Sequence, residues 1–491
     1  MEALRRRVGW LVPAVAALAA QWLLHLAVPQ APFAPFSLGE WLVRQAPGGL
    51  ATAAIDLLGH QALHVVTAMC VAGALALGFA LRRVTPRVLG GVALVASLGA
   101  AWLDPRGPGP PWALAAGAVA ALAAVLASLA VAARPGGQRA GRAMDPGRRR
   151  LLAGIALAAG AAALGGAAAR RVLQPAQAGL VIADRPTVIP HDPSFAGIAG
   201  LSAVVTPTPD HYVVDIDLAD PAVPAGGWAL RVDGAIARPL RLTLADLRAM
   251  PTVERLVTMC CISNPVGGPL VGNARWTGVP LADLLHQAGP TATAATVEAV
   301  AADGYRESYP LPALAGQDVL VAFGMNGAEL PQQHGYPARL LVPGRYGMKS
   351  VKWLTRLALL QAPAAGYWEQ RGWDPVATIR TQSRIDVPAD HTAVPPRFTV
   401  AGIAWAGDRR VARVQVLADD HGPWMPAVLE READPLGWRR WRLGLELPPG
   451  LHTLAVRAVD GTGQVQAAER LPPHPSGASG YHRIVVRVRR A

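Results

Sequence analysis

Long apolar runs in the first third of the chain constrain its fold more than any other feature. A helix needs roughly 20 apolar residues to cross a bilayer. Five runs near this length predict an α-helical transmembrane bundle over residues 1–170, and the 52% hydrophobic content agrees with membrane segments. The runs occupy residues 9–28, 57–81, 88–103, 111–133 and 151–169.

Arginine clusters predict the orientation of this bundle. Three arginines precede the first run, three separate the second from the third, and six separate the fourth from the fifth. The alternate loops, around Glu40–Arg44 and Asp104–Arg106, are poor in positive charge. Because positively charged loops stay in the cytoplasm, everything after residue 170 is expected outside it. This predicts a multi-pass protein of the cell membrane, in contact with membrane lipid.

The net charge of +13 could also indicate nucleic-acid binding, but the distribution of the positive charges does not favour this interpretation. Much of the excess falls in the short clusters between apolar runs, where it sets topology. The sequence has no zinc-finger spacing and no basic helix with interleaved aromatic residues. We therefore expect no nucleic-acid partner.

The fifth run could also be an export signal. Arg148–Arg150, followed by Leu151 and small apolar residues, resembles a twin-arginine signal. We favour retention in the membrane, because no convincing cleavage site precedes Arg170.

Three histidines in or near the first two runs could ligate a b-type haem, since ionisable residues in a membrane are functional candidates. They are His25, His60 and His64. A two-haem bundle needs more facing histidine pairs than these, so haem remains the weaker interpretation.

The remaining chain divides into three parts. Residues 171–196 are proline-rich and aperiodic, which predicts a linker. Residues 197–386 mix short strands with helices, which predicts an α+β domain. Residues 387–491 alternate apolar and polar positions between glycine, proline and aspartate turns, which is typical of a β-sandwich.

Particular elements follow from the same patterns. Helices are expected after a cap at Thr243, with Leu244 and Leu247 on the apolar side, and over Leu281–Ala288. Strands are expected over residues 212–218, 228–234, 319–327, 338–344, 411–419, 438–447, 452–460 and 481–490.

Cys261 stands where an apolar run gives way to a polar, glycine-rich loop. A thiol held there could be a transition-metal ligand or a nucleophile, although free cysteines are more often structural. A redox pair with Cys260 is a third interpretation. Adjacent cysteines form only a strained bridge, and in a strand their side chains point to opposite faces.

Four cationic or ionisable side chains gather in one later segment: His334, Arg339, Lys349 and Lys352. With Gly344 and Gly347 allowing close backbone approach, they could bind a phosphate. A solvated face is the commoner outcome for such a cluster. The apolar residues around these positions favour the buried interpretation, because they draw the segment inward.

Five motifs in one order resemble the sulfite-oxidase family of molybdopterin oxidoreductases. The resemblance extends over residues 197–491. The motifs are C-I-S-N at 261–264, N-A-R-W-T-G-V-P-L at 273–281, F-G-M-N-G at 323–327, H-G-Y-P-A-R-L-L-V-P-G at 334–344 and K-S-V-K-W-L at 349–354.

The resemblance implies a molybdenum-molybdopterin cofactor with Cys261 as the metal ligand. It also implies an immunoglobulin-like dimerisation domain at the C-terminus, and hence a homodimer. The positions that match pterin contacts are Tyr212, Val213, Asp303, His334, Arg339, Ser350, Val351 and Lys352.

Three positions depart from the family pattern. Val214 and Val266 stand where sulfite oxidases carry arginines, and Trp373 stands in place of the active-site tyrosine, so we assign Trp373 a catalytic place. A dianion is costly to bind in a desolvated pocket without those charges. We therefore favour an oxygen-atom transfer whose substrate is not assigned. A less charged or larger substrate, such as a sulfoxide, is the alternative, while Arg275 and Arg371 keep sulfite open.

The resemblance thus predicts a membrane-anchored enzyme that transfers an oxygen atom to or from a small molecule outside the cytoplasm. The sequence has no C-x-x-C-H motif for an attached c-type haem. Electrons would pass to or from a separate electron-transfer protein or a membrane redox carrier. The alternatives are a sulfite oxidase or sulfoxide reductase proper, and a metal-free anchored binding protein.

Overall fold

The computed structural model describes most of the chain after residue 180. The described residues are Val181, 183–190, 192–216, 220–314 and 318–490, together with helix α5 over Ala62–Ala80 and a few residues between 15 and 42. The chain forms two compact units, with α5 in the first and residues 223–491 in the second.

The predicted membrane bundle lies largely outside the described residues. Helix α5 falls within the second apolar run. Among the residues described, no helix is both long and apolar enough to cross a bilayer. His25 and His60 lie outside the described residues, and His64 belongs to α5. The twin-arginine segment and the linker up to residue 180 also lie outside them.

One sheet of the α+β domain has the strand order β2-β1-β10-β5-β6. Strand β1 runs parallel to β10, and the other pairs are antiparallel. The strands are β1 (Ala229–Gly234), β2 (Leu240–Thr243), β5 (Thr296–Ala301), β6 (Arg306–Pro310) and β10 (Leu354–Leu360).

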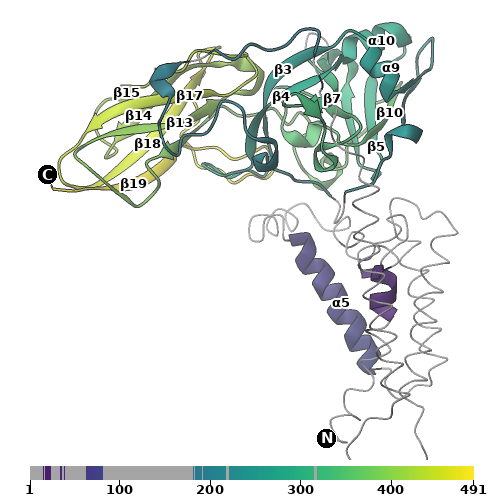
Figure 1. The fold of residues 1–491 in the computed structure, drawn as a ribbon, viewed down its shortest axis with the longest axis horizontal. Helices are drawn as coiled ribbons and strands as arrows, with labels where there is room; N and C mark the ends of the chain where they lie inside the picture. Colours follow the sequence, from purple (N-terminus) through teal and green to yellow (C-terminus); the bar gives the residue numbers. More distant parts are fainter. Residues whose placement is uncertain are drawn as a thin grey trace, which may run out of the picture. The chain divides into compact units, whose positions relative to one another are not determined.

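The second sheet of this domain carries the cysteine motif. Its order is β3-β4-β7-β8, with β9 paired to β7, and β3, β4 and β7 lie side by side in Figure 1. The strands are β3 (Val253–Cys260), β4 (Val271–Pro280), β7 (Leu320–Met325), β8 (Ala328–Glu329) and β9 (Arg339–Leu341). Trp276, which is fully buried on β4, belongs to the core of this sheet.

Both helices predicted for this domain are confirmed. The Thr243 side chain caps α9 (Leu244–Ala249), with Asp246 completing a capping box. Helix α10 occupies Leu281–Ala288 and ends at Gly289 in the left-handed conformation, with φ of 67°. The 3₁₀ turns are η2 (Pro193–Phe195), η3 (Thr208–Asp210), η4 (Ala225–Gly227), η5 (Leu311–Leu314), η6 (Gln332–His334), η7 (Gly347–Lys349), η8 (Glu369–Arg371) and η9 (Gly407–Arg409).

The strand predicted over residues 212–218 is wrong for its described part. Residues 212–215 form no strand. Their side chains are engaged elsewhere: the Asp215 carboxylate pairs with Lys352, and the Tyr212 ring packs beside the core of the second sheet. The alternating pattern therefore reflects tertiary contacts at a site and does not reflect a β-ladder.

The C-terminal part is a β-sandwich, as the alternation predicts. Figure 1 shows its strands gathered at the end of the chain. One sheet has the order β11-β13-β17-β16 and the other β12-β19-β18-β14-β15. The strands are β11 (Gln382–Val387), β12 (Thr392–Val394), β13 (Arg397–Trp405), β14 (Val411–Ala418), β15 (Met425–Pro426), β16 (Val428–Leu429), β17 (Arg439–Glu446), β18 (Gly450–Asp460) and β19 (His482–Val488).

A single apolar core joins the two sheets of the sandwich. It contains Val400 and Trp441 from one sheet and Val416 and Val456 from the other. Strand β11 begins at Gln382 and pairs with β13, so the strand pairing of the sandwich starts before residue 387. The immunoglobulin-like topology stays a prediction.

Candidate functional site

Cys261 follows directly after the last residue of β3. Its amide donates to the carbonyl of Leu270 at 2.9 Å, and its carbonyl accepts from the amide of Asn264 at 3.1 Å, so the thiol is held at a tight turn. Its Sγ lies 3.0 Å from the Ser263 Oγ. Burial raises the pKa of the Cys261 thiol, and the hydrogen bonds from Ser263 partly offset this. A metal cation at the sulfur would favour the thiolate instead.

Cys260 faces a different environment from Cys261. Its side chain belongs to an apolar cluster with Tyr346 and Trp405, and the Asn264 amide donates to its sulfur at 3.6 Å. Burial raises the pKa of the Cys260 thiol. Both cysteines are free. Only Cys260 lies on β3, and Cys261 is not part of the apolar cluster that contains Cys260. The two thiols therefore have different surroundings, which argues against a redox pair.

The Tyr212 hydroxyl is buried, and among the described residues it has no hydrogen-bond partner. A Cβ on Gly347 would lie 2.6 Å from this hydroxyl and 3.5 Å from the carbonyl of Cys260. Burial raises the pKa of Tyr212, the Cys261 thiol raises it further, and Arg339 lowers it. The Tyr212 ring also stacks on that of His211, at 5.2 Å between the ring centroids.

Arg339 presents a buried guanidinium that no carboxylate neutralises. Its Nη1 donates to the carbonyl of His334 at 3.0 Å, and its Nη2 donates to the carbonyl of Ser350 at 2.9 Å. The guanidinium also stacks on Trp276 at 5.0 Å from the ring centroid. Its Nε has no partner, and within the described part of the chain no acidic side chain pairs with it. Burial lowers the pKa of Arg339 to about 10.

Lys352 lies next to Arg339 across Gly335. A Cβ on Gly335 would stand 3.1 Å from atoms of both residues, so the glycine lets them approach. The Lys352 ammonium donates to the Asp215 carboxylate at 2.9 Å and to the carbonyl of Gln333 at 3.1 Å. It also lies 4.4 Å from the centroid of the Trp353 ring.

Two buried histidines complete this group. The rings of His211 and His334 meet edge to face at 5.3 Å. Burial lowers the pKa of His211 to about 4 and that of His334 to about 3, so both are neutral near pH 7. The His334 Nε2 lies 3.3 Å from the carbonyl of Thr208, while the His211 Nε2 has no partner in the part of the chain that the structure describes. We call His211, Tyr212, His334, Arg339 and Lys352 the basic cluster.

His211 and Trp276 are the site residues that sequence reasoning missed. Trp276 lies inside the matched N-A-R-W motif and could have been singled out there. His211 precedes Tyr212 in the sequence, but nothing local to it indicates that it meets His334, which lies 123 residues further on.

Of the other predicted cofactor contacts, Ser350 supports the basic cluster through its backbone carbonyl. Val213 is half-buried. Asp303 is buried and accepts the amide of Tyr305 at 2.8 Å. The Ser350 carbonyl accepts from Arg339, and its Oγ accepts the amide of Val342 at 3.1 Å. Val351 is fully buried.

Lys349 is not part of a phosphate cradle in this structure. Its ammonium lies 2.8 Å from the Glu307 carboxylate and 2.5 Å from that of Glu369. Two carboxylates therefore saturate its charge. Burial raises the pKa of Glu307 to about 7, and Lys349 opposes this rise.

Trp373 packs in the apolar cluster that also contains Cys260. Its ring meets Trp368 at 6.4 Å and His474 at 5.1 Å, both edge to face. Its indole Nε1 is buried and has no partner among the residues described. The assignment of Trp373 as a catalytic residue stays a prediction.

Neither arginine named as a possible anion ligand belongs to the basic cluster. The Arg371 Nη1 donates to the carbonyl of Tyr367 at 2.7 Å, and its guanidinium stacks on that ring at 3.7 Å. The Arg275 guanidinium lies 4.0 Å from the Glu254 carboxylate.

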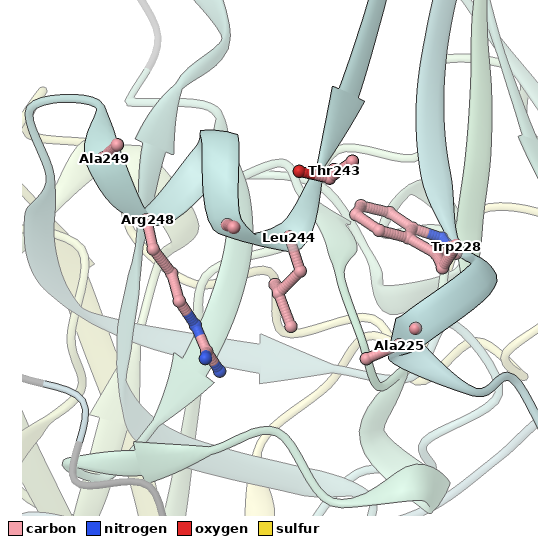
Figure 2. Close-up of a pocket in the computed structure, with 8 residues that line it drawn as sticks. Ala225, Trp228, Thr243, Leu244, Arg248 and Ala249 are labelled. Carbon is pink, nitrogen blue, oxygen red and sulfur yellow. The ribbon is translucent and has the colours of Figure 1, made fainter.

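A separate surface pocket of about 590 Å³ lies beside α9 (Figure 2). Trp228, Leu244 and Arg248 line it, together with small residues. The Arg248 guanidinium forms an ion pair with Glu329. This pocket contains none of the predicted site residues. Across the described residues, no group of three or more His, Cys, Asp or Glu side chains could hold a metal ion.

Known protein families match both domains of the second unit. Residues 217–368 match the family described as the oxidoreductase molybdopterin binding domain. Residues 374–488 match the Mo-co oxidoreductase dimerisation domain. These two matches define a molybdopterin-binding oxidoreductase domain joined to a β-rich dimerisation domain.

Individual relatives point to one family within this class. The chain is 34% identical to the sulfite oxidase of Gallus gallus over 296 residues, which are 50% of this chain and 64% of that protein. It is 31% identical to the mitochondrial sulfite oxidase of Homo sapiens over 312 residues, which are 53% of this chain and 57% of that protein. The chain belongs to the sulfite-oxidase family of molybdopterin oxidoreductases, and it spans less than two-thirds of the length of these two relatives.

A solved structure agrees with this assignment. The sulfane dehydrogenase SoxCD from Paracoccus pantotrophus superposes with a TM-score of 0.53 at 25% identity. The match covers 59% of this chain and 85% of that chain.

Proposed function

We propose that this chain is a membrane-anchored molybdopterin-dependent oxidoreductase that transfers an oxygen atom to or from a small molecule outside the cytoplasm. Family membership supports the cofactor and the class of chemistry. The observation that carries the proposal is the set of buried polar atoms that have no partner in the described part of the chain. One of them, the Tyr212 hydroxyl, lies beside Gly347, which also approaches the carbonyl of Cys260, the residue before the predicted metal ligand.

The residues present fit a pterin that carries a phosphate. Three buried polar atoms of the basic cluster have no partner within the described chain: the Tyr212 hydroxyl, the His211 Nε2 and the Arg339 Nε. Unpaired buried polar groups are costly unless a ligand satisfies them. The bound cofactor would supply two-electron oxygen-atom chemistry, and the protein would position it.

Each residue of the site has a distinct role in this proposal. Cys261 supplies a soft sulfur ligand from a rigid turn. Arg339 offers the unneutralised charge and fork geometry that suit a phosphate. Lys352 adds a second cation, which Asp215 holds in place. The neutral imidazoles of His211 and His334 contribute hydrogen bonds without a charge.

The substrate we favour carries less charge than sulfite. Val214 and Val266 are half-buried apolar residues at the positions where an anion would need arginines. An uncharged sulfoxide is therefore our first candidate and sulfite the second. Steady-state assays would compare the two: a higher kcat/KM for a neutral sulfoxide supports the first candidate, whereas efficient sulfite turnover supports the second.

The membrane anchor and the external location rest on the apolar runs and their arginine flanks. A separate electron-transfer protein or a membrane redox carrier would exchange electrons with the site. The dimerisation domain supports a homodimer. Protease treatment of intact spheroplasts tests the location: degradation of the region after residue 170 supports it, and protection contradicts it.

Metal and pterin analysis of the purified full-length protein tests the function. We expect about one molybdenum and one pterin per chain, since Cys261 is the single predicted metal ligand. A metal-free binding protein would contain neither. Full activity of a Cys260→Ala variant would remove the thiol redox alternative, because that mechanism needs both sulfurs.

A further inference from the structure

The loop that carries Cys261 is supported by residues of the C-terminal sandwich. We call residues 261–270 the cysteine loop. It connects β3 to β4, and two sandwich strands far away in the sequence, β11 and β19, contact it. Because Cys261 is the first residue of this loop, the contacts affect how its sulfur is positioned.

Arg384 on β11 forms the polar part of this support. Its Nη1 donates to the carbonyl of Gly268 at 3.0 Å. The same guanidinium is held from two other sides, by the Asp386 carboxylate at 2.7 Å and by the Ser202 hydroxyl at 3.0 Å. A guanidinium fixed at three points is a rigid donor, so the position of the Gly268 carbonyl is tied to β11.

His482 on β19 forms the steric part. A Cβ on Gly267 would lie 2.2 Å from the His482 Cδ2, so the imidazole fits against the loop only because this residue is glycine. Gly267 also has φ of 77°, which a side chain would strain. The His482 Nδ1 accepts the amide of Ile385 at 3.0 Å, which fixes the ring orientation.

The third contact is apolar and involves the two residues next to Cys261 in the sequence. Cys260 and Ile262 flank Cys261 in the sequence, and both pack in the apolar cluster with Trp405 and Trp438 of the sandwich. The residues on either side of the metal ligand are therefore anchored in a core that the two domains share.

From these contacts we infer that the sandwich is a positioning element for Cys261, in addition to forming the dimer. Arg384 and His482 would be positioning residues: they hold the cysteine loop so that the sulfur meets the metal in one orientation. This inference rests on the proposed function as far as the metal is concerned. The rigidity of the loop itself does not depend on it.

The experiment compares Arg384→Ala, Arg384→Lys and a matched control in full-length protein. The control is Arg397→Ala, which removes an exposed ion pair with Glu446 in the same sandwich. All variants carry Cys260→Ala, so that alkylation by iodoacetamide near the loop reports Cys261 alone. Alkylation is measured on cofactor-free protein by mass spectrometry of the Cys261 peptide. Visible absorption of the holoenzyme reports the thiolate-to-metal charge-transfer band.

We expect Arg384→Ala to speed alkylation of Cys261 at least tenfold and to shift the absorption band. Arg384→Lys should recover part of both effects, since a lysine can still donate to the Gly268 carbonyl. Arg397→Ala should match the parent protein. If Arg384→Ala fails to fold, Gly267→Ala is the second variant, and it should produce the same two changes.

Alkylation and absorption that stay at parent values in both Arg384→Ala and Gly267→Ala would overturn the inference. So would equal changes in Arg397→Ala. If the parent protein binds no molybdenum but the alkylation contrast persists, the proposed function fails while the support of the loop stands. The two failures are thus distinguishable.

Discussion

Arg339 and Lys349 are buried cations ten residues apart in the sequence, yet their surroundings differ in kind. The Lys349 side chain is 3% exposed and lies between the carboxylates of Glu307 and Glu369. Arg339 is also 3% exposed, but backbone carbonyls and the face of Trp276 are its contacts. Lys349 is neutralised by the protein, and Arg339 retains a net positive charge.

The difference separates a structural cation from a ligand-binding one. A buried charge is costly unless it is paired. Lys349 meets this requirement within the chain, so it has nothing to offer a ligand. Arg339 does not meet it, so an anion bound there would remove an existing cost. Cationic residues in one motif therefore have to be judged by their partners, and their spacing is not sufficient.

Removing Lys349 should have the largest effect on folding. Lys349→Met would leave Glu307 and Glu369 buried without a counter-charge, which costs about 3–5 kcal/mol for a buried pair. Chemical denaturation of cofactor-free protein would measure the loss. A loss below about 1 kcal/mol, the range of an exposed pair, would contradict the structural role.

Removing Arg339 should have its largest effect on the cofactor. Arg339→Met frees two carbonyls and costs about 1–3 kcal/mol of stability. Because the unpaired charge is lost, pterin and molybdenum content should fall at least about tenfold, a change worth about 1.4 kcal/mol or more in binding.

The control for Arg339→Met is Arg356→Met, which removes a half-buried ion pair with Asp233 away from the cluster. It should leave cofactor content unchanged. Unaltered molybdenum content in Arg339→Met would show that Arg339, like Lys349, does not bind the cofactor.

Lys352 should be intermediate between Lys349, whose charge is neutralised by the protein, and Arg339, whose charge is not. Its ammonium has one carboxylate partner, Asp215, so its charge is partly compensated. Lys352→Ala should lower cofactor content by a few-fold, about 1 kcal/mol. This is below the ~1.5–3 kcal/mol of a hydrogen bond to a charged group, because Asp215 already compensates part of the charge. Double-variant cycles with Asp215→Asn would measure how much of this effect passes through the ion pair. A loss as large as that of Arg339→Met would show that the ion pair does not compensate the charge.

The last prediction concerns pH. Burial raises the pKa of Glu307 from 4.5 to about 7 in the folded protein. The folded state then holds a proton that the unfolded state has lost. The contribution of Glu307 to stability is therefore greatest below pH 4.5 and declines as the pH rises to about 7. Glu307→Gln should flatten this decline in denaturation series between pH 4.5 and 7.5. An identical pH dependence in the wild type and the variant would show that Glu307 titrates normally.

Local patterns predicted much of this fold. The Thr243 cap and the helix over Leu281–Ala288 were predictable because capping and amphipathic periodicity are local properties. The sandwich strands were predictable because each buries one face. Residues 212–218 show the limit of this reasoning: alternation there comes from contacts with a site, and periodicity alone cannot distinguish the two causes.

The site was predictable in its residue types but not in its pairings. The motifs indicated Cys261, His334, Arg339 and Lys352. They could not separate Lys349 from Arg339, because Glu307 lies 42 positions before Lys349 and Glu369 lies 20 after it. Nor did any local signal show that Arg384 and His482 reach the cysteine loop, since those contacts depend on how the sandwich packs.

Cys261 as the metal ligand is tested most directly by the molybdenum content, visible absorption and turnover of three purified full-length proteins: wild type, Cys261→Ser and Cys260→Ala. We predict about one molybdenum per chain in the wild type and in Cys260→Ala, since Cys260 faces the apolar cluster. Cys261→Ser should lose the thiolate-to-metal absorption band and all turnover, because a hydroxyl is a poor replacement for a soft thiolate. Full turnover and an unchanged band in Cys261→Ser would contradict the assignment of this sulfur as the metal ligand.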